Sequence, residues 1–198
     1  MRNKNSTPSA DRKAAILKEA VKLFAEQGYH NTTLDEVAKG LGITKAALYY
    51  YFSGKGQIIR AIMKTSMDQM SRTVKLGSAK MTPREKLREF IRFHVTVTAE
   101  NADASRILFE QLHALPRQAR QAIRRREKET DSTLQKILSE GNADGTFNVS
   151  DVKVASYALL GLCVWTYHWY RGEGRLSPEQ IADVLAGLVE QGVLRHPA

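Results

Sequence analysis

The fold of this chain follows from residues 34–52, which read LDEVAKGLGITKAALYYYF. Two short helices that cross closely need a small residue at their contact, and Ala38 supplies it. The tight turn between them needs a residue that tolerates positive φ, and Gly42 follows four positions later. The small core between the two helices is expected to contain Val37, Leu41, Ile43 and Leu48. This spacing predicts a helix-turn-helix whose second helix begins at Thr44.

Helical periodicity continues on both sides of this motif, and no stretch alternates as a strand would. The helix before it covers 11–28 and is expected to end at Gly28, while Thr33 and Glu36 form a capping box for the next. Pro83 suits a helix start after Thr82. Further helices are predicted over 55–76, from Pro83 onward, and over 103–114, 117–141, 150–170 and 178–194. The chain is therefore expected to be all-α, with about nine helices.

The bulk composition indicates a globular protein with a polyanionic partner. The chain has 198 residues, 42% of them hydrophobic and 26% charged, with a formal net charge of +9. A strongly basic balance favours nucleic acid as a partner. The one cysteine, Cys163, allows no internal disulfide, and no apolar run reaches the roughly 18 residues needed to span a bilayer. We expect a cytoplasmic protein without a membrane contact.

The motif resembles a known DNA-binding domain. The block TTLDEVAKGLGITKAALYYYFSGK at 32–55, after AVKLFAEQGYHNTT at 20–33, is similar to that of the TetR family. The resemblance implies a homodimer with a three-helix DNA-binding head over 1–55 and a ligand-binding and dimerisation core over 56–198. It further implies a sequence-specific regulator, in the usual case a repressor, that a small molecule releases from a palindromic double-stranded operator.

The same resemblance implies which side chains meet DNA. The positions that correspond to phosphate contacts are Thr33, Tyr49, Tyr51 and Lys55. The positions that correspond to base reading, or to packing on thymine methyl groups, are Thr44, Lys45, Ala46 and Ala47. Lys45 is the expected specific base reader, whereas Tyr50 matches a packing position and is expected in the core. The run Ser53-Gly54-Lys55-Gly56 departs from the family pattern, because the acid that usually follows the lysine is missing.

The last two helices are the expected dimer interface. The segment VKVASYALLGLCVWTYHWY at 152–170 is apolar nearly all round, which predicts burial on every side. Small residues at Ala155, Ala158 and Gly161 permit close approach of another helix. In the family resembled, these helices form a four-helix bundle across a two-fold axis. We therefore expect homodimer contacts through 152–170 and 178–194.

The effector is expected among the middle helices. Candidate lining residues are Phe90, Phe93, His94, Phe109, His113, Arg124, Tyr157 and Trp165. The segment WYRGEGRLSP at 169–178 is similar to TetR-type regulators of fatty-acid and sterol breakdown, which sense acyl-CoA thioesters. Guanidinium groups suit CoA phosphates, and basic residues at helical steps offer them at Arg117, Arg120, Arg124 and Lys128. A solvated helix face is the alternative interpretation of that basic row.

Three other functions compete with this interpretation. A regulator of an efflux pump that senses hydrophobic drugs would share the same motif. A non-specific architectural DNA binder would show little operator preference. An enzyme is disfavoured, because no nucleophile with a paired base, carboxylate dyad or glycine-rich phosphate loop is visible. The two candidate histidines, His94 and His113, have no second ligand at coordination spacing, so we expect neither a metal nor a cofactor.

Overall fold

The computed structural model describes residues 8–193, except for the side chains at 8, 66–72, 74 and 193. Within this part of the chain the elements are α-helices and one 3-10 turn, with no β-strand, so the all-α class is confirmed. None of its helices combines the length and apolar character that crossing a bilayer requires.

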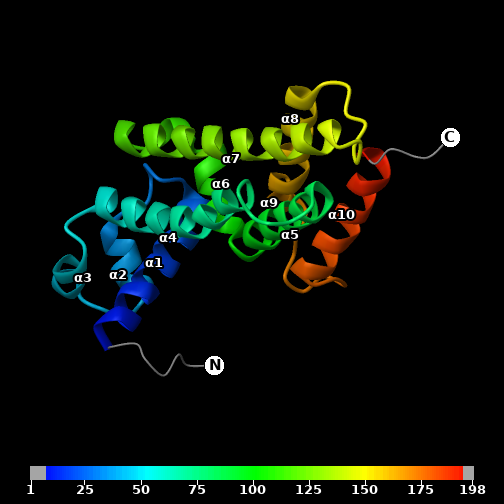
Figure 1. Ribbon diagram of the computed structural model, residues 1–198. Coiled ribbons are helices and arrows are strands. Elements are labelled where there is room, and N and C mark those ends of the chain that lie inside the picture. The colour runs from blue at the N-terminus through cyan, green and yellow to red at the C-terminus, as the bar shows by residue number, and fades with distance from the viewer. Residues whose placement is uncertain (1–7, 194–198) are drawn as a thin grey trace. The chain divides into compact units, whose positions relative to one another are not determined.

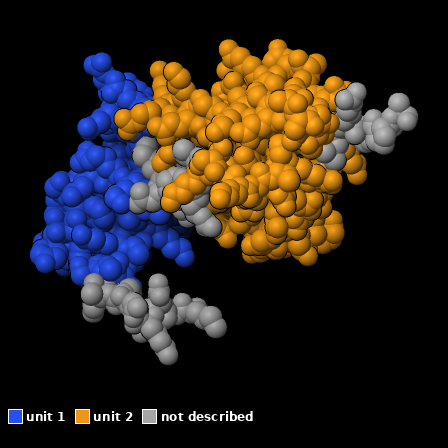
Figure 2. Space-filling view, in the orientation of Figure 1, with its two compact units in different colours: residues 1–66, 103–122 blue, residues 67–102, 123–198 orange. Residues whose placement is uncertain are grey.

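The chain divides into two compact units, shown in blue and orange in Figure 2. Unit 1 comprises residues 1–66 and 103–122, and unit 2 comprises residues 67–102 and 123–198. Unit 1 is therefore not a simple N-terminal segment, because a stretch from the middle of the sequence packs with it. That stretch is missing from the predicted head.

Unit 1 contains the predicted helix-turn-helix. The preceding helix ends as expected at Gly28, whose φ is 91°, and it turns Ile16, Ala20 and Phe24 fully inward. The elements of this unit (Figure 1) are α1 (Pro8–Gln27), α2 (Leu34–Gly40), α3 (Lys45–Tyr51), the first part of α4 (Lys55–Leu76), α6 (Ala102–Glu110), the 3-10 turn η1 (Leu112–Ala114) and the start of α7 (Arg117–Ala143).

Unit 2 is built around α5 (Pro83–Glu100), which lies against α8 (Val152–Val164), α9 (Thr166–Trp169) and α10 (Pro178–Val193). Thr82 and Glu85 form the expected capping box, with Pro83 at the first turn of α5. The core of the unit draws on α5, α7, α8 and α10. Its buried members are Leu87, Phe90, Ile91, Val95, Leu134, Ile137, Leu138, Phe147, Leu159, Cys163, Ile181, Ala182, Ala186 and Val189.

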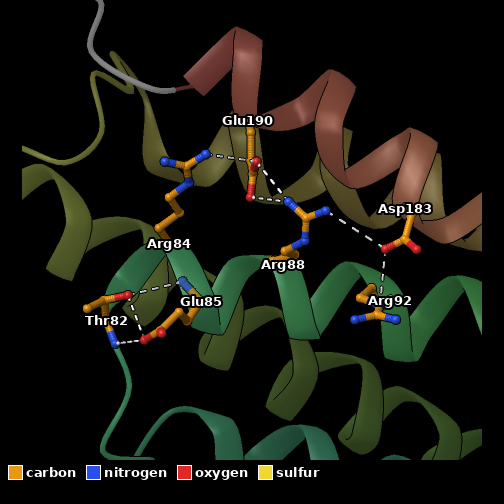
Figure 3. Close-up of polar contacts among 7 residues, drawn as sticks. All are labelled: Thr82, Arg84, Glu85, Arg88, Arg92, Asp183 and Glu190. Atoms are coloured by element: carbon orange, nitrogen blue, oxygen red, sulfur yellow. Dashed lines mark hydrogen bonds and ion pairs between the residues drawn. The ribbon is translucent and has the colours of Figure 1, made fainter.

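A charged network joins α5 to α10 beside this core (Figure 3). The Glu190 side chain is only 8% exposed, and its carboxylate accepts hydrogen bonds from Arg84 at 3.2 Å and from Arg88 at 3.1 Å. Asp183, two turns earlier, pairs with Arg92 at 3.3 Å. A carboxylate this buried is costly without its cations, so the network fixes which face of α10 packs on α5.

Helix α8 differs from the helix predicted over 150–170 in two ways. It begins at Val152 rather than at 150, and Asp151 caps it, because the Asp151 carboxylate accepts from the backbone N–H groups of Lys153 and Val154. It is also interrupted at Trp165, where the carbonyl accepts from the His168 N–H, three residues on, at 3.0 Å. That tighter pattern is the 3-10 type, so the interruption is a local change of hydrogen bonding.

Candidate nucleic-acid and effector sites

The turn of the helix-turn-helix has the geometry that the sequence predicts. Ala38 is buried where α2 meets α3, and its carbonyl accepts from the N–H of Leu41 at 3.2 Å and of Ile43 at 3.0 Å. Gly42 has a φ of 62°, in the left-handed region that favours glycine. The turn therefore depends on the small side chain of Ala38 and on the positive φ of Gly42.

Helix α3 presents a polar and aromatic outer face. Thr44 caps it, with its hydroxyl oxygen accepting from the Ala47 N–H at 3.1 Å, and Leu48 is its fully buried residue. The predicted base-reading positions are all exposed, namely Thr44, Lys45, Ala46 and Ala47. Tyr49 is 45% exposed on the same helix. These side chains are accessible to a duplex.

The prediction that Tyr50 packs in the core is wrong. Its side chain is 83% exposed, the most exposed of the three consecutive tyrosines. Leu48 and Phe52 fill the inner positions, four residues apart, and a residue midway between them points to the opposite side of the helix. Tyr50 instead packs edge-to-face on the half-buried Tyr51, with ring centroids 5.1 Å apart. Tyr50 therefore joins the outer face of α3.

Lys45 is held by an acidic neighbour that the sequence analysis did not single out. Both carboxylate oxygens of Asp35, on α2, lie 3.0 Å from Lys45 Nζ. The hydrogen bond and the charge of Asp35 raise the pKa of Lys45. The ammonium also lies 6.0 Å from the centre of the Tyr49 ring. The cation is therefore oriented at the start of α3 by groups on both helices of the motif.

Thr33 is engaged in the predicted capping box of α2. Its hydroxyl oxygen accepts from the Glu36 N–H at 3.2 Å, and the Glu36 carboxylate accepts from the Thr33 N–H at 2.7 Å. The hydrogen bonds that the Glu36 carboxylate accepts from the Thr33 N–H and, at 2.8 Å, from the Thr33 hydroxyl lower the pKa of Glu36. Thr33 remains exposed at the N-terminus of α2, where free backbone N–H groups favour an anion such as a phosphate.

Lys55 binds two backbone carbonyls of its own unit. Its ammonium donates to Tyr29 O at 2.8 Å and to His30 O at 2.9 Å, and lies 5.1 Å from the centre of the Tyr29 ring. Helix α4 begins at Lys55 as predicted. The missing acid is replaced by Gln57, whose side-chain oxygen accepts from the Ser53 N–H at 2.7 Å.

Gln111 is a connecting residue that sequence reasoning missed. It lies between α6 and η1, yet its side-chain amide donates to Phe24 O at 2.9 Å and accepts from the Tyr29 N–H at 2.8 Å. It thus satisfies both backbone groups where α1 ends. No local pattern around Gln111 predicts a partner more than 80 residues earlier in the chain.

The predicted effector residues fall into a buried group and an exposed group. Phe90 and His94 are buried together, with ring centroids 4.3 Å apart, and the Phe93 ring lies 5.5 Å from that of His94. Burial lowers the pKa of His94 to about 4. Phe90, Phe93 and His94 therefore form one group on α5. The other candidates are exposed, in unit 1 at Phe109 and His113 and in unit 2 at Arg124, Tyr157 and Trp165.

An exposed apolar row runs along α8 and another along α10. The prediction that the helix over 152–170 is buried on every side is therefore wrong, since Val154 is 63%, Tyr157 54% and Trp165 55% exposed. On α10, Val184 is 62% and Leu188 59% exposed. Exposed apolar side chains gathered along a helix often mark a protein–protein interface. We call these five side chains the apolar rows.

Family models match both parts of the chain. The model of bacterial regulatory proteins of the tetR family matches residues 16–62. The model of the tetracyclin repressor-like C-terminal domain matches residues 80–193, more than half of the sequence. The first match includes all of α2 and α3, and the second includes α5 to α10.

Individual proteins are similar over nearly the whole length. The transcriptional repressor KstR2 of Mycolicibacterium smegmatis is 29% identical over 94% of this chain and 94% of its own. The structure of AibR in complex with isovaleryl coenzyme A and operator DNA is 30% identical, covering 89% of this chain and 97% of that one, with a TM-score of 0.75. KstR2 of Mycobacterium tuberculosis has the same fold, with a TM-score of 0.84, 22% identity and 98% of each chain covered.

Proposed function

The chain belongs to the TetR family of bacterial transcriptional regulators. From this premise we propose that it represses its target genes by binding a palindromic operator through α3. It is a DNA-binding repressor that responds to a ligand. The observation that carries the proposal is the exposed outer face of α3 behind a closed helix-turn-helix. A regulator of this kind needs no catalysis, and we propose none.

Direct base reading is assigned to the first turn of α3. Lys45 supplies hydrogen-bond donors for a guanine edge, and the methyl groups of Ala46 and Ala47 suit thymine methyls. Thr33, Tyr49, Tyr51 and Lys55 are proposed phosphate contacts, which set register without reading sequence. For this role residues 1–55 act as the DNA-binding part and residues 56–198 as the effector and dimerisation part.

A homodimer is proposed through the apolar rows of α8 and α10. Two copies of a symmetric surface bury the same side chains on each protomer, and the pair of heads then reads two half-sites about one helical turn apart. The exposure of Tyr157 and Trp165 supports a place in or beside this interface. Ala158 and Gly161, both exposed between them, permit close helix approach.

The proposed effector is an acyl-CoA thioester. Support comes from the similarity to AibR, a regulator crystallised with isovaleryl coenzyme A and operator DNA. An effector changes operator affinity only by as much as its own affinity differs between the two conformations of the protein. In the proposed cycle, the ligand favours the conformation in which the heads do not fit the operator.

Selection of binding sites from random duplexes, followed by anisotropy titrations at fixed salt, tests the proposal. We expect a palindrome bound at least about a thousandfold more tightly than random DNA, and relief of binding by members of an acyl-CoA panel. Equal affinity for all duplexes would refute operator reading. Release by apolar drugs, with no response to any thioester, would instead refute the effector class and leave the operator role intact.

A further inference from the structure

An open groove of about 470 Å³ lies in unit 2, on α7 and the loop that follows α4. Its size is that of a small-molecule site. Gly77 and Ser78 line it from the loop, where small side chains leave room for a ligand. The lining residues from α7 are Arg125, Lys128, Glu129, Ser132, Thr133 and Lys136.

The α7 residues of this groove share one helix face. Positions 125, 128, 132 and 136 follow one another at steps of three or four, the spacing that stacks side chains on one side. Three of these four positions carry a cation. The first and last of them, Arg125 and Lys136, are about 16 Å apart along the helix axis, since each residue adds about 1.5 Å. The cationic row is therefore much longer than one carboxylate or one phosphate.

Carboxylates leave the charge of this row largely uncompensated. Glu129 pairs with Arg126, outside the groove, at 2.8 Å. Glu140 is 3.9 Å from Lys136 but 2.8 Å from the buried Lys86. Among the described residues, neither Arg125 nor Lys128 has an ion-pair partner.

We propose that this groove binds an anion with several phosphate groups, such as a nucleoside diphosphate. Arg125 offers paired N–H donors to phosphate oxygens, and Lys128 and Lys136 act as point charges along the same row. The Ser132 hydroxyl adds a neutral hydrogen-bonding group. Two sources share this chemistry, namely the nucleotide portion of coenzyme A and a free nucleotide. Only the first of them rests on the proposed effector function.

Of the basic residues predicted to meet CoA phosphates, Lys128 lines the groove. Arg120 is already engaged as a cap, donating to Leu115 O at 2.7 Å and to His113 O at 3.3 Å. Arg117 lies at the start of α7 and outside the groove. It carries the same charge on the same helix, which makes Arg117→Gln a matched control.

Calorimetric titration of the full chain tests the proposal, with coenzyme A, dephospho-coenzyme A, ADP and pantetheine as probes. We expect coenzyme A to bind, pantetheine not to bind, and affinity to fall as salt rises. The double variant Arg125→Gln/Lys128→Gln should weaken binding by roughly tenfold or more, the equivalent of about 1.4 kcal/mol. Arg117→Gln should change it by less than about twofold.

The four probes and the two variants distinguish coenzyme A from a free nucleotide as the ligand, and they distinguish failure of the groove from failure of the proposed effector. ADP binding as tightly as coenzyme A, with both weakened in the double variant, identifies a free nucleotide as a sufficient ligand and upholds the groove. Coenzyme A binding that is the same in the double variant and the wild type overturns the groove, as does an equal loss in Arg117→Gln. An acyl-CoA that still releases operator from the double variant at unchanged concentration rejects the groove but leaves the proposed effector standing.

Discussion

The Asp35 carboxylate and the Lys45 ammonium are 3.0 Å apart, which ties the first residue of α3 to the start of α2. Both side chains are about 60% exposed, at 61% and 60%. An ion pair so exposed contributes little to folding stability. Its effect is directional, because it restricts where the proposed base-reading cation points before DNA arrives.

Replacing Lys45 with alanine is expected to weaken operator binding about tenfold or more and to relax specificity at one position in each half-site. The reason is that a lost base contact penalises the correct sequence and leaves random DNA nearly unaffected. Anisotropy titrations with operator, single-position variants and random duplex measure this. Lys80→Ala, which removes the same charge from unit 2, is the control. Equal weakening on operator and random DNA would contradict the assignment.

Asp35→Asn gives the complementary prediction. Loss of the carboxylate removes repulsion from DNA phosphates and frees Lys45, so affinity for random duplex should rise while the ratio of operator to random affinity falls. The two affinities are measured at several salt concentrations, because phosphate contacts depend on salt. A ratio that stays constant would mean that Asp35 does not position Lys45.

Lys55 is expected to stabilise unit 1 as well as to contact DNA. Lys55→Met keeps most of the aliphatic stem but leaves the Tyr29 and His30 carbonyls without their donor, which costs about 1–3 kcal/mol. Urea unfolding at fixed protomer concentration measures the loss, with Lys39→Met as an exposed control in the same unit. The slope of log affinity against log salt should also flatten, by about one unit per head. Reduced stability with an unchanged slope would remove Lys55 from the phosphate contacts.

Gln111 is predicted to protect the Tyr29 amide. In Gln111→Ala the Tyr29 N–H loses its acceptor, while the Phe24 carbonyl keeps the Gly28 N–H as a donor. Hydrogen exchange at Tyr29 should accelerate roughly tenfold, in line with an unmade hydrogen bond. Gln111→Glu keeps the acceptor for Tyr29 and should preserve most of the protection. Exchange followed by NMR distinguishes the two variants. Equal rates in both would show that the acceptor oxygen has no protective role.

Local rules were sufficient for much of this fold. Gly28, Gly42 and the Thr33–Glu36 capping box were predicted because each depends on backbone dihedral angles or on residues three positions apart. Tyr50 was misplaced because its assignment rested on family position, whereas the helical phase set by Leu48 turns it outward. A tyrosine accepts either environment.

Contacts between distant segments were beyond sequence reasoning. The partners of Lys55 and Gln111 are backbone groups, and a backbone carbonyl or amide has no residue-specific signal. The difference in burial among the candidate effector residues was unpredictable for a similar reason. Aromatic residues such as Phe90 and Trp165 have comparable hydrophobicity, but one is buried in the core and the other lies exposed at the C-terminal end of α8. Helical periodicity alone does not say which apolar face meets solvent or a second chain.

A single charged substitution in the apolar rows is expected to dissociate the proposed dimer. Leu188→Arg places a cation within a surface that excludes water when paired, so the variant should sediment as a monomer at micromolar concentration with unchanged helix content. It should also lose the preference for a full palindrome over a half-site. Met81→Arg, at an apolar side chain that is 38% exposed elsewhere in unit 2, should remain dimeric. A dimeric Leu188→Arg protein would place the interface elsewhere, and a monomeric wild type would refute the homodimer.

His94 makes the stability of the chain depend on pH in the acid range. Burial holds its pKa near 4 in the folded state, whereas an unfolded histidine titrates near 6.5. Between these values the unfolded chain binds more protons, so stability falls as pH falls below about 6.5 and is insensitive to His94 above about 7. Between pH 7.5 and pH 5 this one residue should cost about 2 kcal/mol.

Urea unfolding at the two pH values, at fixed protomer concentration, measures the effect in wild type and in His94→Gln. Glutamine can keep a hydrogen bond to Thr73, whose hydroxyl is 3.2 Å from His94 Nε2, but it carries no titrating proton. The variant should therefore be less stable at pH 7.5, where repacking dominates, yet lose less stability on acidification than wild type. His113→Gln, at an exposed histidine, should leave the pH dependence as it is. An identical acid loss in wild type and His94→Gln would mean that His94 is protonated in the folded chain, and hence that its site on α5 admits water or a counter-charge.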